Sequence, residues 1–378
     1  MSGKLLVISV LIMLSVGVAG QDSIRFSGQV SSWFNINPGN KLPLAGGVRY
    51  IPQFDYMKDI GGDKLFDAEL SANIYGNGSI RPFDSVRYNG KVKPYRGWIR
   101  YSTDQFELRL GLQKLNFGSA MMLRPLMWFD QIDPRDPLQL TDGVWGLLAR
   151  YYFLNNANIW LWSLYGNSGV RGWETIPVNK KIPEFGGRVQ LPVPKGEMAF
   201  TYNHRVADSR DMGTEITSYE RIPENKFGFD IKWDLEAGLW LEGSYTNKLK
   251  DVGIFTNQLA LNAGADYTVG LGNGLYFAYE QLLASYDEKP FTFSNKAVFS
   301  LLRISYPVGI IDNLSAIIYY DWSNRKSYNF LNWQRQYDRV SLFFMAYWNP
   351  DTFLLPAQSG TQNIFTGKGI QVMFVFNH

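Results

Sequence analysis

Hydrophobic and polar residues alternate with a period of two along most of this chain. Between Lys226 and Leu235, every second side chain is apolar or aromatic, and the residues between them are charged or small. Because successive side chains leave a β-strand on opposite faces, the pattern predicts strands with one apolar and one polar face. It recurs at regular intervals, so we expect an all-β fold.

The predicted strands are joined by connections that alternate between short and long. The short ones are rich in Gly, Asn, Asp and Pro, as turns are, and cover 102–104, 155–157, 194–196, 236–238 and 270–274. The long ones cover 76–91, 116–142, 167–183, 207–224 and 350–366. This alternation is typical of an antiparallel, up-and-down transmembrane β-barrel, with its apolar side toward lipid and its polar side toward a lumen.

The strand number depends on one stretch. We interpret Ser327 to Trp348 as two strands that turn near residues 337–339, which gives about 18 strands. If this stretch were one long strand, 16 would remain open, because single-chain barrels of this class have an even number.

Both ends of the chain carry export features. Lys4, the apolar run from Leu5 to Val16 and the small residues before Gln21 predict a cleaved signal peptide over 1–20. The remainder, 21–378, is then a single barrel. Its last segment, Gly369 to Phe376, resembles the C-terminal strand of outer-membrane proteins, which the barrel-assembly machinery recognises. The chain departs from that pattern by ending in Asn377-His378 rather than in an aromatic residue.

Composition narrows the class further. The chain has no cysteine, which excludes disulfides, thiolate metal sites and a lipid-modified N-terminal cysteine. Aromatic residues make up 16% of the chain, enough for belts at both membrane interfaces. A formal net charge of +3 argues against nucleic acid as a partner. Lipid of a Gram-negative outer membrane is the predicted surrounding, and a soluble periplasmic β-sandwich is the alternative.

The alternation assigns charged residues to the lumen. We expect a basic arc on neighbouring strands, made of Arg96, Arg100, Arg109, Arg150, Arg188 and Arg205. An opposing acidic wall would contain Asp67, Glu69, Glu242, Asp266, Glu280 and Asp321. Walls of opposite sign orient dipolar solutes and set ion preference. The arginines could equally brace the lumen by pairing with carboxylates, and the sequence leaves both roles open.

The longest connection, 116–142, has an unusual composition for a surface loop. It carries Met121, Met122, Leu126, Trp128 and Phe129 among other apolar residues. Such residues need burial, and inside a barrel they can find it against the inner wall. We therefore predict an inward-folded loop that narrows the pore, with a packed surface lid as the alternative. Its charged residues, the constriction candidates, are Arg124, Asp130, Asp133, Arg135 and Asp136.

Short motifs in this region resemble those of known outer-membrane channels. Gly111-Leu112-Gln113, then Asn116-Phe117-Gly118, and the run from Ile132 to Pro137 are similar to large-barrel porins of the alginate-export type. The resemblance covers about residues 105–145. It implies an 18-stranded monomeric channel, in some members with basic ladders for anionic solutes.

Catalytic and cofactor chemistry is not evident. His204 and His378 are the only histidines, and His204 alternates onto the apolar face. Asp130, Asp133 and Asp136 could offer oxygen ligands to calcium, but we interpret them as solvated or arginine-paired. We predict no enzyme, no metal and no cofactor. The leading hypothesis is a passive channel for small hydrophilic, anionic solutes. An export or structural partner for a surface polysaccharide or protein, and an outer-membrane hydrolase, are the alternatives.

Overall fold

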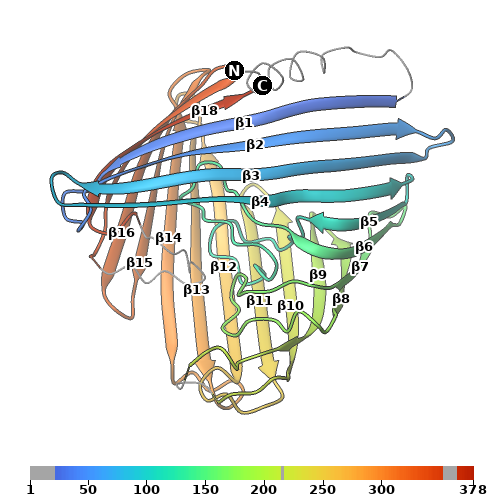
Figure 1. The fold of residues 1–378 in the computed structure, drawn as a ribbon. Coiled ribbons are helices and arrows are strands. Elements are labelled where there is room, and N and C mark those ends of the chain that lie inside the picture. The colour runs from blue at the N-terminus through green and yellow to red at the C-terminus, as the bar shows by residue number, and fades with distance from the viewer. Residues whose placement is uncertain (1–21, 214–216, 352–363) are drawn as a thin grey trace, which may run out of the picture.

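The computed structural model describes residues 22–213, 217–351 and 364–378, so the predicted signal peptide lies outside the described residues. The chain forms one closed antiparallel sheet of 18 strands, in which β1 pairs with both β2 and β18 (Figure 1). The strands are β1 (Asp22–Ile36), β2 (Leu44–Asp59), β3 (Leu65–Arg81), β4 (Ser85–Ser102), β5 (Phe106–Gln113), β6 (Val144–Tyr152), β7 (Asn158–Leu164), β8 (Glu184–Val193), β9 (Gly196–Ala207), β10 (Ile222–Asp234), β11 (Gly238–Lys248), β12 (Asn257–Val269), β13 (Leu275–Asp287), β14 (Lys296–Pro307), β15 (Asp312–Asp321), β16 (Lys326–Gln336), β17 (Val340–Trp348) and β18 (Lys368–Asn377). The prediction of an 18-stranded barrel is confirmed.

The uncertain stretch is two strands. β16 ends at Gln336 and β17 begins at Val340. The Tyr337 amide donates to the Val340 carbonyl at 2.7 Å, which closes the turn. The alternative of 16 strands is thereby excluded.

One predicted loop is wrong. We expected an outer-surface loop over 76–91, but β3 runs on to Arg81 and β4 starts again at Ser85, leaving a link of only 82–84. Glycines and polar side chains suggested a loop, but this part of the hairpin projects beyond its neighbours, as Figure 1 shows. Its backbone pairs fully, from Gly76 with Gly90 to Arg81 with Ser85, and side chains exposed on both faces need no apolar alternation.

Side chains follow the alternation where the barrel wall is continuous. On β10, Phe227 is 50% exposed, whereas its neighbours Lys226 and Gly228 are buried toward the interior. A charge on the outer face would cost about 2–4 kcal/mol near the middle of a bilayer, so the inward placement of charge is physically favoured. Among the residues that the structure describes, no helix has the length and hydrophobicity to cross a bilayer.

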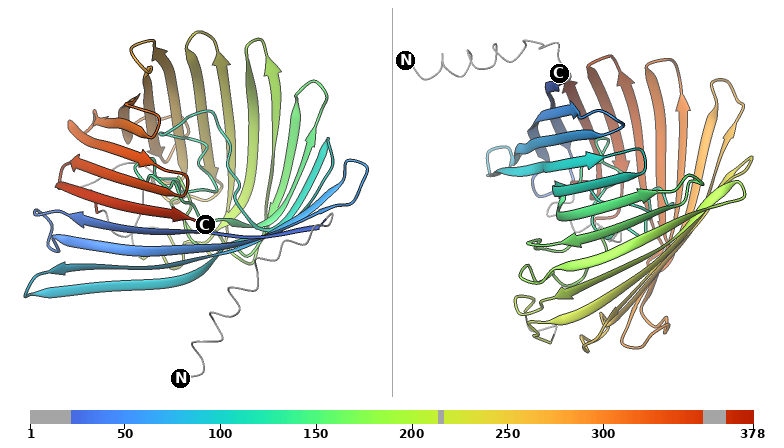
Figure 2. Two further views of the ribbon diagram at one scale, coloured as in Figure 1. Left: turned by 90° about the horizontal axis from the view of Figure 1, so that it is seen from above. Right: turned by 90° about the vertical axis from the view of Figure 1, so that its right-hand side faces the viewer.

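The wall is uneven around the barrel. β4 has 18 residues and β7 only 7, and at about 3.3 Å per residue this difference amounts to tens of ångströms. The long connections on either side of β6 and β7, residues 114–143 and 165–183, run inside the barrel (Figure 2). The short strands therefore border the part of the lumen that these connections fill.

The two ends of the chain meet at the seam of the barrel. The amides of Gly28 and His378 each donate to the other residue's carbonyl, at 3.1 and 3.0 Å. The His378 ring lies against Phe26, Tyr50 and Phe376. A planar ring therefore occupies the C-terminal position at which the sequence lacks the usual aromatic residue.

Candidate functional site

The connection 114–143 folds into the lumen, as predicted, and two carboxylates of the wall hold it there. Glu242 on β11 accepts hydrogen bonds from the amides of Ala120 and Leu126, at 2.8 and 2.6 Å. Glu280 on β13 accepts from the amides of Met121 and Leu123, at 2.7 and 2.6 Å. The amides of this loop do not pair with a neighbouring strand. The two carboxylates accept the hydrogen bonds that strand carbonyls would otherwise accept.

Apolar packing fixes the same loop. Leu126, Trp128 and Phe129 are at most 3% exposed and pack against Trp162 and other side chains of the wall. The indole Nε1 of Trp128 also donates to the Ser244 hydroxyl at 2.9 Å. The apolar side chains of this loop are thus buried in the barrel interior, which confirms the prediction of an inward-folded loop.

Gly118 is required where the loop approaches the wall. Its φ is +106°, and a Cβ there would lie 2.5 Å from a carboxylate oxygen of Glu242. Both the backbone conformation and the close approach exclude a larger side chain. The Asn-Phe-Gly motif therefore has a positional explanation.

A second inward segment, 165–183, was not predicted. The Trp173 indole donates to the carbonyl of Arg124 at 2.7 Å, so this segment packs against the constriction loop. Its Glu174 is buried among Arg171, Arg205 and Lys226, with nitrogen–oxygen distances of 3.0, 3.2 and 2.9 Å. Burial alone would raise the pKa of Glu174, but these cations lower it to about 2. The missed signal was Trp173 and Ile176 within a loop rich in charged residues.

Three arginines of the predicted basic arc meet on β4, β5 and β6. Arg100, Arg109 and Arg150 surround Glu107 at 3.6, 3.0 and 3.6 Å. Arg100 also forms a two-point contact with Asp67, at 2.8 and 2.7 Å. Three guanidinium groups share two carboxylates, which leaves 3 − 2 = 1 positive charge in excess. The three arginine side chains keep 26%, 15% and 16% of their surface exposed.

The other arginines of the arc are buried, which corrects their assignment as pore-lining groups. Arg188 forms a bidentate pair with Asp230 at 2.6 and 2.9 Å. Arg205, with no exposed surface, pairs with Glu224 at 2.6 Å. Arg96 donates to the carbonyls of Tyr95 and Thr141 and is 7% exposed. Carboxylates and inward-folded loops cover these side chains, so they brace the barrel.

The acidic wall also differs from the prediction. Asp67 and Glu69 lie on β3 beside the arginines, because β3 pairs with β4, and so they do not oppose them. Asp321 is fully buried and accepts from the amides of Ser323 and Asn324, which makes it a turn cap. Asp266 is half-buried and bonds the Gly238 amide and the Tyr276 hydroxyl. Together with the two loop anchors, Glu242 and Glu280, these acids serve structural contacts.

The constriction candidates separate into two groups. Arg124 and Asp130 pair at 2.8 Å in the buried base of the loop, which corrects their placement at the opening. Asp133 pairs with Arg135 at 2.6 Å and keeps 31% of its side chain exposed. The guanidinium of Arg135 lies 5.7 and 5.2 Å from the ring centroids of Phe330 and Phe365, and Asp136 caps the amide of Leu138 at 3.0 Å. Asp133, Arg135 and Asp136 lie in the middle of the loop, but Arg135 is only 7% exposed, which corrects its placement at the opening.

A column of cations that the sequence reading missed extends along β4. Arg87, Lys91 and Lys93 lie on the face opposite the exposed Val86 and Val92, so they point inward. Lys93 pairs with Asp142, and its ammonium lies 5.9 Å from the Tyr75 ring centroid. Arg49 lies 5.5 Å from the same centroid. Alternation within 85–93 would have revealed this column if that stretch had been read as a strand.

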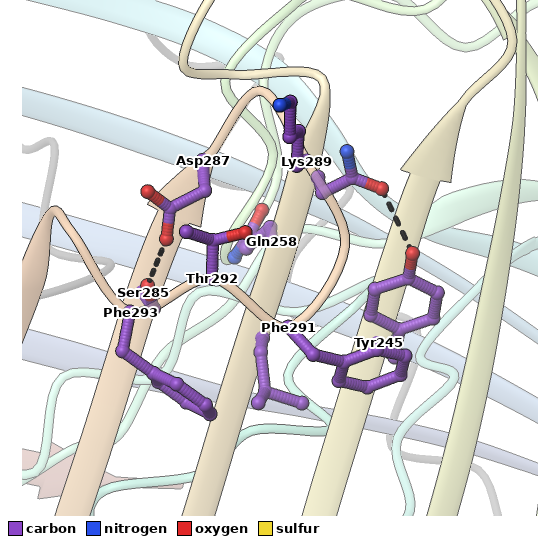
Figure 3. A pocket seen from close by; sticks show the side chains of 10 residues that line it. Tyr245, Gln258, Ser285, Asp287, Lys289, Phe291, Thr292 and Phe293 are labelled. Carbon is purple, nitrogen blue, oxygen red and sulfur yellow. Dashed lines mark hydrogen bonds between the residues drawn. The ribbon is translucent and has the colours of Figure 1, made fainter.

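A separate pocket lies where 288–295 folds over β11 to β13. In Figure 3, Phe291 stacks on Tyr245 at 4.9 Å between ring centroids, and the Ser285 hydroxyl donates to Asp287 at 2.7 Å. The cavity between them has a volume of about 10 Å³, which is room for about one water molecule. We assign it a structural role.

Comparison with solved structures agrees with the architecture. OmpT of Vibrio cholerae, an outer membrane protein in its trimer form, aligns over 95% of this chain and 100% of its own, with 11% identity and a TM-score of 0.52. OccAB4 of Acinetobacter baumannii aligns over 95% of this chain and 98% of its own, with 11% identity and a TM-score of 0.56. OccAB1 of the same organism aligns over 96% of this chain and 97% of its own, with 10% identity and a TM-score of 0.56. The chain has the fold of outer-membrane β-barrels.

Sequence comparison adds nothing to this. No protein-family model and no curated protein match the chain. The likeness at 10–11% identity therefore concerns the fold alone.

Proposed function

We propose that this protein is a passive channel of the Gram-negative outer membrane that passes small hydrophilic solutes and prefers anions. The observation that carries the proposal is the excess of accessible cationic charge on one side of the lumen. Arg100, Arg109 and Arg150 share two carboxylates, and Arg49 has no carboxylate within ion-pair distance among the described residues. An aqueous path lined by fixed positive charge concentrates anions.

The constriction loop supports a selective path rather than an open one. It crosses the lumen interior, and Asp133 there keeps 31% of its side chain exposed, while Arg135 is buried against Phe330 and Phe365. Of the motifs at 105–145, Gly111-Leu112-Gln113 ends β5 and the other two lie in this loop, and the alginate-export-like type remains a proposal that rests on them. The C-terminal strand β18, which closes the barrel against β1, is our candidate for recognition by the barrel-assembly machinery.

We propose no catalytic role. The His204 ring lies on the outer face, where it contacts the Phe185 ring and bonds Asn225 at 2.8 Å. A hydrolytic site needs a nucleophile, a base and an orienting group within reach of one another. The placement of His204 away from the lumen charges favours a channel over the hydrolase alternative.

The direct test is conductance of the purified protein in a planar lipid bilayer. We expect stepwise insertion of ion-conducting units, and a reversal potential in a KCl gradient that shows higher permeability for chloride than for potassium. A cation-preferring channel would contradict the anion preference. A barrel that conducts nothing and co-purifies with a surface polysaccharide or protein would instead support the export or structural alternative.

A further inference from the structure

The outer half of β4 has an edge that no neighbouring strand covers. β3 is paired with β4 along its whole length and with β2 as far as Ile80. On its other side, β4 pairs with β5 only from Gly97 to Ser102. Among the described residues, the backbone of 85–94 therefore meets no strand on that side, and β4 extends beyond the end of β5 (Figure 1). Residues 85–92 are all exposed.

This edge lies beyond the bilayer, at the end of the barrel that carries the long connections. A strand needs about 9–11 residues to cross a bilayer, and β5, β6, β7 and β8 have only 8, 9, 7 and 10. The short strands are thus used up by the crossing, and β4 pairs with β5 over that stretch alone. The unpaired part of β4 therefore extends into water.

One face of this edge carries apolar side chains. Val86, Tyr88 and Val92 are 68%, 89% and 69% exposed and point away from the lumen. A free strand edge offers unpaired backbone donors and acceptors, and apolar side chains beside it favour the addition of another strand. The edge therefore has both features that strand addition uses.

The other face of the edge is cationic. Arg87 and Lys91 alternate with the apolar side chains, and neither has a carboxylate within ion-pair distance among the described residues. Lys93, the next cation of this row, lies where the end of the constriction loop reaches β4, and Asp142 of that loop pairs with it. An added strand would place its side chains on the same two faces. Its inward side chains would then meet Arg87 and Lys91.

A second copy of this chain fits the edge poorly. Two copies that paired through 85–92 would bring Arg87 and Lys91 of both chains onto one shared face, and that stretch contains no carboxylate. Like charges on facing strands are destabilising, whereas opposite charges are stabilising. The cations therefore select against self-pairing and in favour of an acidic strand.

We propose that residues 85–92 of β4 are a docking edge for an extended segment of a partner polypeptide in which acidic and apolar residues alternate. The segment adds one strand to the outer rim of the barrel. Backbone hydrogen bonds hold it, its carboxylates pair with Arg87 and Lys91, and its apolar side chains cover Val86, Tyr88 and Val92. This interaction is separate from the passage of solutes and does not depend on the proposed channel function.

Fluorescence anisotropy of a labelled peptide, titrated with the detergent-solubilised full barrel, tests the docking edge. The probe is a short synthetic peptide of alternating Glu and Val, which we expect to bind. A peptide of alternating Lys and Val should bind at least tenfold more weakly. The Glu-Val peptide with every backbone nitrogen methylated keeps its charges but has no backbone donors. Its affinity should also fall at least tenfold, because attraction between charges alone does not replace strand pairing.

Variants of the barrel locate the binding site. R87Q/K91Q removes the cations of the edge and should weaken the affinity for the Glu-Val peptide at least tenfold. The control K64Q/R339Q removes two exposed cations from short turns at the opposite end of the barrel, and it should leave the affinity unchanged.

Three results would overturn the proposal: no binding of the Glu-Val peptide, equal binding of either control peptide, or an unchanged affinity in R87Q/K91Q. A dimer in detergent that dissociates when the peptide is added would make a second copy the occupant and would overturn the acidic partner. The KCl reversal potential of the same preparation is measured independently. An anion-preferring channel that binds no peptide keeps the proposed function and loses the docking edge.

Discussion

Two groups of inward-facing arginines differ in how far they are exposed to the lumen of this barrel. On β4 to β6, Arg100, Arg109 and Arg150 crowd around one glutamate and stay partly exposed to the lumen. On β8 and β9, Arg188 and Arg205 are buried: Arg188 pairs with Asp230, and Arg205 shares Glu174 and Glu224 with other buried cations. Strand alternation gives both groups the same face. The cover that the inward segments give, shown by Glu174 of 165–183 lying against Arg205, distinguishes the arginines that are buried from those that meet solute.

The largest expected effect comes from the buried side of this comparison. R205Q would remove the two-point partner of the buried Glu224 and one of the three cations around Glu174, and breaking a buried pair typically costs about 3–5 kcal/mol. Urea unfolding in lipid vesicles, followed by tryptophan fluorescence, measures the loss. The matched control R210Q removes an exposed loop arginine and should leave the unfolding midpoint unchanged. A midpoint for R205Q equal to that of the control would show that the network contributes no stability.

Release of the constriction loop should change conductance. E242A/E280A removes the carboxylates that accept hydrogen bonds from the backbone amides within residues 120–126, so the loop loses these polar contacts with the wall. We expect a severalfold higher single-channel conductance with frequent fluctuations. D234A, an exposed acid on β10, is the control for loss of a carboxylate. Wild-type conductance in the double variant would mean that apolar packing alone holds the loop.

The accessible arginines should control selectivity. R100Q/R109Q/R150Q removes the cationic excess around Glu107 and should shift the chloride-to-potassium permeability ratio toward or below one. R188Q removes an arginine that is buried with Asp230 and should change the ratio far less. Reversal potentials in a KCl gradient distinguish the two. Equal shifts in both variants would contradict the division between accessible and bracing arginines.

The smallest effect is a pH dependence of the buried network. Because the pKa of Glu174 is lowered to about 2 from an ordinary value near 4.5, its ionised form stabilises the folded state. This contribution is fully present above about pH 4.5 and is lost as the pH falls toward 2. The urea midpoint of the wild type should fall over that window. In E174Q this part of the decline should be missing, and an identical decline in both proteins would assign it to other carboxylates.

The sequence predicted the fold well because membrane and lumen impose a two-sided pattern on every strand. It also predicted the inward loop, since Trp128 and Phe129 cannot remain in water. Where the hairpin of β3 and β4 leaves the wall, both faces are solvated, so alternation is lost over 76–81 of β3 and persists only on β4, over 86–93. The partners of each charge depend on strand register and loop packing, which explains why Arg205 and Arg150 look equivalent in the sequence.

The anchors of the constriction loop have a consequence for assembly. Glu242 and Glu280 lie 116 to 159 residues later in the sequence than the loop amides from which they accept hydrogen bonds. Whether strand pairing begins at β1 or at β18, the loop meets its anchors only when β5, β6, β11 and β13 have all formed. The loop can therefore dock only late, after most strands are paired. We expect the newly inserted barrel to have a transiently wide lumen, which narrows when the constriction loop docks as the last step.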